Sequence, residues 1–198
     1  GIGYWGSLPY VFLGSLQWEW FMENEPPSRN DLVTTTIGGQ VVGEVLHRAS
    51  NLILDDSARG AERVYREAAA LVINPFGGLN RAATGRMTAR GPAPRRPPTE
   101  MRIAQTIGRF WRGDNLSVPA SATSFVMDYG DLYRLPSRIG PFDYFELEVG
   151  RSVTKSEPGW IAYVNAIVAG RKASTPDGNS ITFAVVENYD YFSSKTND

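Results

Sequence analysis

Phe145-Glu146-Leu147-Glu148-Val149 is the stretch that decides the fold, because apolar and acidic residues alternate in it. A period of two places the apolar side chains on one face of a β-strand and the polar side chains on the other. The same period recurs to the C-terminal end, and turn sequences stand at 156–159 and 175–178. We therefore expect an antiparallel β-meander over residues 101–198, with strands at about 102–111, 116–128, 142–154, 160–170 and 180–192.

The first 80 residues follow a helical period instead. Pro9 suits a first helical turn, and the aromatic-rich stretch from Leu8 to Met22 follows it. A second helix is expected from the capping residues around Ser28 to about Leu54, with apolar residues every three to four positions. A third is expected, capped by Asp55-Asp56-Ser57 and closed by Pro75 and the Gly77-Gly78 pair. Its apolar residues form one stripe: Ala61, Val64, Tyr65, Ala68, Leu71 and Val72. The fold class is therefore α+β, with a three-helix N-terminal unit.

Residues 81–100 differ from both zones, because they contain five arginines and four prolines and no acidic residue before Glu100. Such a segment buries too little apolar area to offset the conformational entropy that is lost when it becomes ordered. We interpret it as a solvated linker or loop. The alternative is a basic arm that touches anionic lipid or nucleic acid, although no aromatic residue alternates with the arginines as a nucleic-acid groove requires.

The composition restricts the chemistry. The 198 residues are 42% hydrophobic, and 20 basic against 21 acidic residues give a net charge of −1, which argues against a nucleic-acid partner. The chain has no cysteine and one histidine, His47, which excludes thiolate and multi-histidine metal sites. We assign no metal ligand, and the sequence leaves any cofactor unknown, although a carboxylate and His47 could share a metal with a third ligand. No apolar run reaches the roughly 20 residues of a membrane-spanning helix.

Strands of about ten residues separated by short turns are typical of an outer-membrane barrel. Aromatic residues gather near the strand ends, and two aromatic-Asp-Tyr-Phe units, 142–145 and 189–192, fall at matching predicted positions. Rings at a membrane–water boundary form such a girdle. Five strands are fewer than the roughly eight of the smallest bacterial barrel, so the expected barrel is incomplete. A soluble antiparallel sandwich uses the same alternation and remains the alternative.

One polar stripe on the second helix carries candidate chemistry. It consists of Gln40, Glu44, His47, Asn51 and Asp55, spaced at three and four residues. Glu44 and His47 stand one turn apart, so the carboxylate can orient the imidazole for general acid–base work. The alternative is that the stripe is the water-facing side of an amphipathic helix.

Several motifs of the helical zone carry a resemblance to a known family. They are Trp18-Glu19-Trp20-Phe21, Glu25-Pro26-Pro27-Ser28, Asn30-Asp31-Leu32, 34–39, Gly43-Glu44, His47-Arg48, 54–57, Asn74-Pro75 and 78–81. This combination resembles an uncharacterised bacterial family of Gram-negative envelopes, a domain of unknown function in which the helical segment precedes an outer-membrane β-barrel. The same segment also looks like the lipocone superfamily, which includes VanZ-like proteins and is proposed to process lipids or their head groups.

The resemblance implies a cell-envelope protein, at the outer membrane or its periplasmic face, with membrane lipid as its partner. It implies a polar pocket in which Glu19, Asp31, Glu44 and His47 carry catalysis. Substrate binding is assigned to Glu23, Gln40, Arg48 and Asn51. On this hypothesis the helical unit processes or binds a lipid or lipid head group. The alternative is a non-enzymatic barrel protein whose helices form a structural plug or cap.

Overall fold

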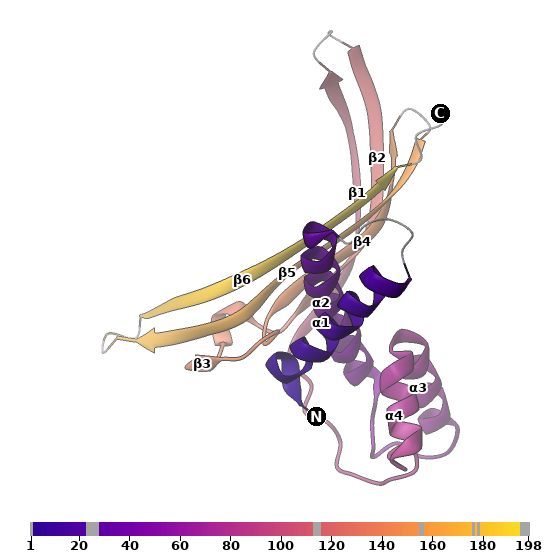
Figure 1. The fold of residues 1–198 in the computed structure, drawn as a ribbon. Coiled ribbons are helices and arrows are strands. Elements are labelled where there is room, and N and C mark those ends of the chain that lie inside the picture. Colours follow the sequence, from indigo (N-terminus) through magenta and orange to yellow (C-terminus); the bar gives the residue numbers. More distant parts are fainter. Residues whose placement is uncertain are drawn as a thin grey trace. The chain divides into compact units, whose positions relative to one another are not determined.

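The computed structural model describes residues 2–22, 28–112, 116–154, 157–175, 177 and 179–194. In these residues four helices precede a six-stranded antiparallel sheet, which confirms the α+β class (Figure 1). The chain divides into two compact units, Gly1–Arg96 and Pro97–Asp198. Among the described residues, no helix has the length and apolar character needed to cross a membrane.

The first two helices form an antiparallel pair in the helical unit. α1 spans Gly3–Phe21 and begins before Leu8, with Pro9 inside it. α2 spans Arg29–Ile53, close to the predicted range, and Ser28 caps it by accepting a hydrogen bond from the Asp31 N–H at 3.3 Å. A β-region Ser at this position satisfies one of the free N–H groups of the first turn.

The expected third helix is α3 (Gly60–Ile73), which ends before Pro75 as predicted, but the sequence missed a fourth helix, α4 (Pro75–Ala83). Pro75 occupies the first position of α4. The Asn74 side chain caps this helix, because its Oδ1 accepts a hydrogen bond from the Gly77 N–H at 2.9 Å. The Gly77-Gly78 pair lies inside α4. A Cβ on Gly78 would lie 3.1 Å from the Leu71 Cα, so the glycine permits close packing of α4 on α3.

The predicted cap of α3 is also wrong. Asp55 accepts hydrogen bonds from the Ser57 N–H (2.9 Å) and hydroxyl (2.6 Å), and so closes a local turn ahead of the helix. The helix begins at Gly60, after Arg59, without a side-chain cap.

Five long strands form the sheet in the order β1, β2, β4, β5, β6, and each neighbouring pair is antiparallel. Their bounds are Thr99–Arg112, Leu116–Tyr129, Phe145–Thr154, Glu157–Ser174 and Ser180–Ser194. The sequence missed the short β3 (Arg138–Ile139), which pairs with β5, and it placed a turn at 156–159 where β5 already begins. Within the described residues β1 and β6 are not paired, so the sheet is not closed into a barrel.

The register separates the sheet into two chemically different faces. One row across all five long strands is apolar: Ile103, Phe125, Val149, Ala162 and Tyr191. The opposite face carries a polar row: Glu100, Asp128, Glu146, Asn165 and Asn188. Residues paired across strands share a face. We call the first the apolar face and the second the polar face after these rows, although Gln105, Thr123 and Arg151 also lie on the first and Val126, Ile161 and Phe192 on the second.

The apolar face is exposed over much of its length. Ile103 and Ile107 on β1 are 80% and 79% exposed, and Phe183 and Val185 on β6 are also exposed. On the polar face Arg102 donates to Asp128 and lies 3.8 Å from Glu146. Water-exposed apolar rows of this kind on a long sheet are uncommon in a water-facing protein.

The two aromatic-Asp-Tyr-Phe units do not occupy matching strand positions. Phe142 and Phe145 are 0% exposed, and Phe142 adopts φ 59° in the turn before β4. Asp143 holds that turn by accepting from the Gly140 N–H at 2.7 Å. The second unit runs along β6, where Tyr191 lies on the apolar face and is 51% exposed. Only the second unit is therefore placed to contribute to an aromatic girdle.

Candidate functional site

Two predicted site residues lie between α1 and α2. Glu19 is 3% exposed, and its Oε2 accepts a hydrogen bond from the Ser28 N–H at 3.2 Å. Gln40 is buried, and its Nε2 donates to the Tyr4 carbonyl (2.6 Å) and the Ser7 hydroxyl (2.8 Å). Both contacts join α1 to α2. In this structure Glu19 anchors the start of α2, where the helix dipole favours a negative charge.

Glu44 and His47 were expected to pair with each other, but each pairs with a different residue. Glu44 forms an ion pair with Arg48 at 2.7 Å, and the His47 Nε2 lies 3.1 Å from the Asn51 side-chain amide. Arg48 stands four residues after Glu44 and carries a permanent charge, so it outcompetes an imidazole three residues away. Asp31 is exposed in the first turn of α2.

The structure therefore divides the predicted stripe between two environments. Gln40 is covered by α1, whereas His47 and Asn51 are solvent-exposed side chains further along α2. Glu23 lies outside the described residues. The seven candidate residues that the structure describes do not share one pocket.

A cluster of ion pairs joins α3, α4 and the turn before α3. Arg81 on α4 contacts Glu67 on α3 and Asp56 in the turn, each at 2.7 Å. The hydrogen bond to Glu67 raises the pKa of Arg81 above its ordinary value, and the contact with Asp56 adds to this. Arg63 donates to the carbonyls of Met87 (2.7 Å) and Ala89 (2.6 Å). The arginines thus hold the 86–89 segment, which the sequence assigned to the linker, against α3.

His47 lines a hollow of about 150 Å³ beside this cluster. Its wall is polar and comes from α2, α3 and α4 and the residues that flank them: His47, Ser50, Asn51, Leu54, Glu67, Ala70, Asn74, Gly77, Gly78, Asn80, Arg81 and Arg86. We call it the polar pocket. Glu67, its one carboxylate, is engaged by Arg81. Arg81 and Arg86 against Glu67 leave the lining with a net positive charge, so the pocket suits an anion better than a cation.

Sequence reasoning missed Glu67, Asn74 and Arg81. Glu67 stands next to Ala68, at the border of the apolar stripe of the predicted third helix, where burial of an acidic side chain requires a partner. Arg81 stands fourteen residues later along the chain, beyond any helical spacing rule. Its partner could not be identified without the α3–α4 packing. Within the described residues, no group of three or more acidic or histidine side chains is arranged to hold a metal ion.

These features define an α+β protein with a polar pocket in its helical unit. Residues 1–76 match the family described as domain of unknown function (DUF3943), so this part of the chain is similar to an uncharacterised family, as the sequence motifs indicated. The search of curated proteins returned no match. The search of solved structures returned none either.

Proposed function

We propose that this chain is part of an outer-membrane protein of Gram-negative bacteria whose helical unit binds the anionic head group of a lipid. The observation that carries the proposal is the division of the sheet into an exposed apolar face and a polar face. Alternation of this kind is the pattern of strands with lipid on one side and water on the other.

The exposed residues of the apolar face support the membrane part of the proposal. They occur on strands at both edges and in the middle of the sheet: Met101, Ile103, Ile107, Phe125, Val149, Trp160, Ile181, Phe183, Val185 and Tyr191. Burying apolar area contributes about 25 cal/mol per Å², so lipid contact stabilises these side chains where water does not.

Helix α1 gives independent support. Apolar side chains occur on every side of it, apart from polar residues such as Ser7 and Glu19 that face α2, and most of its large side chains are exposed, including Trp5, Trp18, Trp20 and Phe21. A helix that is hydrophobic all round is normally covered by protein or by lipid. Tryptophan is enriched at the membrane–water interface, where its ring meets both media.

The polar pocket supports head-group binding. Asn51, Asn80 and Arg86 offer donors from three segments, while Arg81 neutralises the carboxylate of Glu67. Phosphate and carboxylate groups are recognised by such convergent donors. We expect His47 to contribute a further donor to the bound anion.

Native mass spectrometry of the chain in a neutral detergent tests head-group binding. The probes are phosphatidylglycerol, which is anionic, and phosphatidylcholine, which carries no net charge. We expect preferential retention of phosphatidylglycerol, and a reduction of roughly fivefold in the His47→Ala and Arg86→Ala variants, because each removes one donor.

Arg95→Ala is the matched control, since Arg95 is exposed and does not line the polar pocket. Equal retention of the two lipids, or equal loss in all three variants, would contradict the proposal. A change in the mass of the bound lipid would favour processing over binding.

A further inference from the structure

A second hollow lies on α3, separate from the polar pocket. It measures about 580 Å³, within the roughly 300–1,000 Å³ typical of small-molecule sites. Its lining comes from α3, its preceding turn and the segment after α4: Ala58, Arg59, Gly60, Arg63, Val64, Glu67, Ala68, Leu71, Met87, Thr88 and Arg90. We call it the amphipathic groove. It shares Glu67 with the polar pocket, and Arg86 lines the pocket while Met87 and Thr88 line the groove.

One part of the amphipathic groove is apolar. Val64, Ala68 and Leu71 stand at three- and four-residue steps on α3, and Met87 from the segment after α4 also lines the groove. The sequence predicted this stripe as a packed helix face, yet Val64 is 67% exposed. Methionine adapts its shape readily to an apolar ligand.

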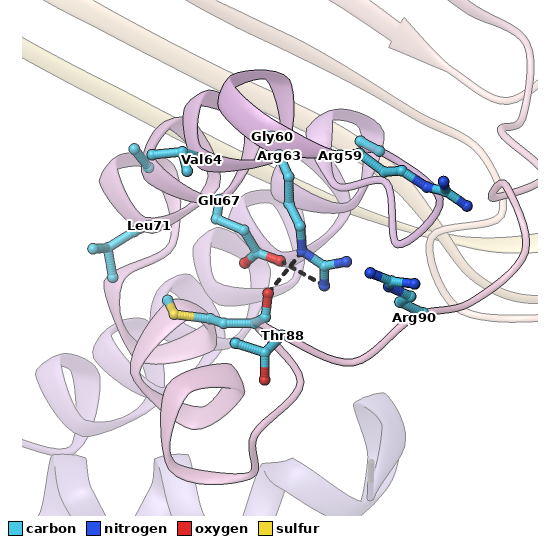
Figure 2. Close-up of a pocket in the computed structure, with 11 residues that line it drawn as sticks. Arg59, Gly60, Arg63, Val64, Glu67, Leu71, Thr88 and Arg90 are labelled. Carbon is cyan, nitrogen blue, oxygen red and sulfur yellow. Dashed lines mark hydrogen bonds and ion pairs between the residues drawn. The ribbon is translucent and has the colours of Figure 1, made fainter.

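The other part of the groove is cationic. Figure 2 shows the guanidinium groups of Arg59, Arg63 and Arg90 on one side and Val64 and Leu71 on the other. Arg63 is committed to backbone carbonyls and lies 3.9 Å from Glu67. Arg59 and Arg90 are exposed, and within the described residues no ion pair or hydrogen bond engages their side chains. Two positive charges therefore stand at the groove without a balancing anion.

We propose that the amphipathic groove binds a single-chain anionic amphiphile, with the acyl chain along Val64, Ala68, Leu71 and Met87 and the anionic head group against Arg59 and Arg90. A free phosphate would leave the apolar wall in water, and a neutral chain would leave the two arginines unpaired. Guanidinium groups bind carboxylate and phosphate in a bidentate manner, so both fatty acids and lysophospholipids have the required chemistry.

This inference rests on the proposed function in that both require lipid at the helical unit, but its residues differ from those tested in the polar pocket. Only Glu67 is shared, and Glu67 is already paired with Arg81. Loss of amphiphile binding with intact phosphatidylglycerol retention would separate the two sites.

Photolabelling tests the proposal. The probe is a palmitic acid analogue with a diazirine on its chain, added to the full chain in phosphatidylcholine nanodiscs. We expect labelled peptides to contain residues 60–71 or 86–90. The Arg59→Ala/Arg90→Ala double variant should reduce labelling about fivefold to tenfold, since two exposed charges are lost, and Val64→Gln should reduce it by a similar factor. Circular dichroism checks that both variants are folded.

Matched controls are Arg95→Ala and Tyr65→Gln, because both side chains are exposed nearby and neither lines the groove. Palmitate and lysophosphatidylglycerol are the anionic competitors, and the stronger one identifies the head group. Monopalmitoyl glycerol should compete weakly. Equal competition by the neutral amphiphile, unchanged labelling of the double variant, or labels confined to other peptides would overturn the proposal.

Discussion

The helical unit and the strand unit both expose large apolar side chains, but the sequence pattern behind that exposure differs. In the strand unit the exposed residues follow the two-residue period of the strands, as Ile181, Phe183 and Val185 do on β6. In the helical unit the exposed apolar side chains of α1 follow no such period. Specific polar contacts join its helices instead, such as Gln40 with Tyr4 and Arg81 with Glu67. The strand unit is built on backbone pairing and periodic apolar rows, whereas in the helical unit specific polar contacts add to a small set of buried apolar residues: Val41, Val45 and Ala70.

The largest expected effect compares the two aromatic-Asp-Tyr-Phe units of the sheet. Phe145 is fully buried and stacks on Tyr129 with ring centroids 4.8 Å apart. Phe145→Ala should therefore lower the free energy of unfolding by about 3–5 kcal/mol. Phe192→Ala, at the corresponding position of the exposed unit, should change it by less than about 0.5 kcal/mol. Denaturant titration of both variants in the same detergent measures the difference, and equal effects would show that the units are equivalent.

The next effect concerns the ion-pair cluster. Arg81→Ala leaves the carboxylate of Glu67, which is 12% exposed, without its partner, and should destabilise α3 and α4 by about 2–4 kcal/mol. Hydrogen exchange of the α3 and α4 amides measures this. The Glu67→Leu/Arg81→Met double variant should recover much of the loss, because no unpaired charge remains.

Arg95→Ala serves as the control for a lost surface arginine and should leave the exchange rates unchanged. If Arg81→Ala exchanged no faster than this control, the polar cluster would not be what holds the helical unit together.

A smaller effect should have opposite signs at two buried positions of α2. Among the described residues, the hydroxyl of buried Thr36 has no hydrogen-bond partner. Thr36→Val should raise stability by about 1 kcal/mol, because an unsatisfied polar group is removed. Gln40→Ala removes two donated hydrogen bonds and should lower it by about 1–2 kcal/mol. Thermal unfolding of both variants tests the pair, and a loss in Thr36→Val would indicate a hydrogen bond there.

The smallest effect is a pKa shift. The Ser57 hydroxyl and N–H hold the pKa of Asp55 below its ordinary value. A lowered folded-state pKa adds stability above the ordinary aspartate pKa, and that contribution is lost as the pH falls through the folded-state value. Ser57→Ala should raise the pKa of Asp55, as measured by carbon-detected NMR titration. An unchanged pKa would show that the hydroxyl does not stabilise the carboxylate; Ser137→Ala, in the strand unit, is the control.

The sequence predicts the sheet better than the helical site. Alternation at 145–149 and 181–186 is local, so the five long strands were identified within a few residues. The short β3 was missed because Arg138–Ile139 has no period and forms only by pairing with β5. The turn at Phe142 was read as strand, because its conformation depends on the Asp143 contact with Gly140.

On the helices, spacing correctly placed Gln40, Glu44, His47 and Asn51 on one helix. It could not show that α1 covers Gln40, since that depends on where the neighbouring helix lies. Nor could it favour Arg48 over His47 as the partner of Glu44 without the side-chain geometry.

The central claim is that the apolar face of the sheet contacts lipid while the polar face contacts water. The chain contains no cysteine, so single cysteines at Ile103, Ile107, Thr106 and Asn188 can each carry a spin label in reconstituted bilayers. Accessibility to oxygen and to a water-soluble nickel chelate should alternate: Ile103 and Ile107 accessible to oxygen, Thr106 and Asn188 accessible to the chelate. High chelate accessibility at all four positions would contradict the account.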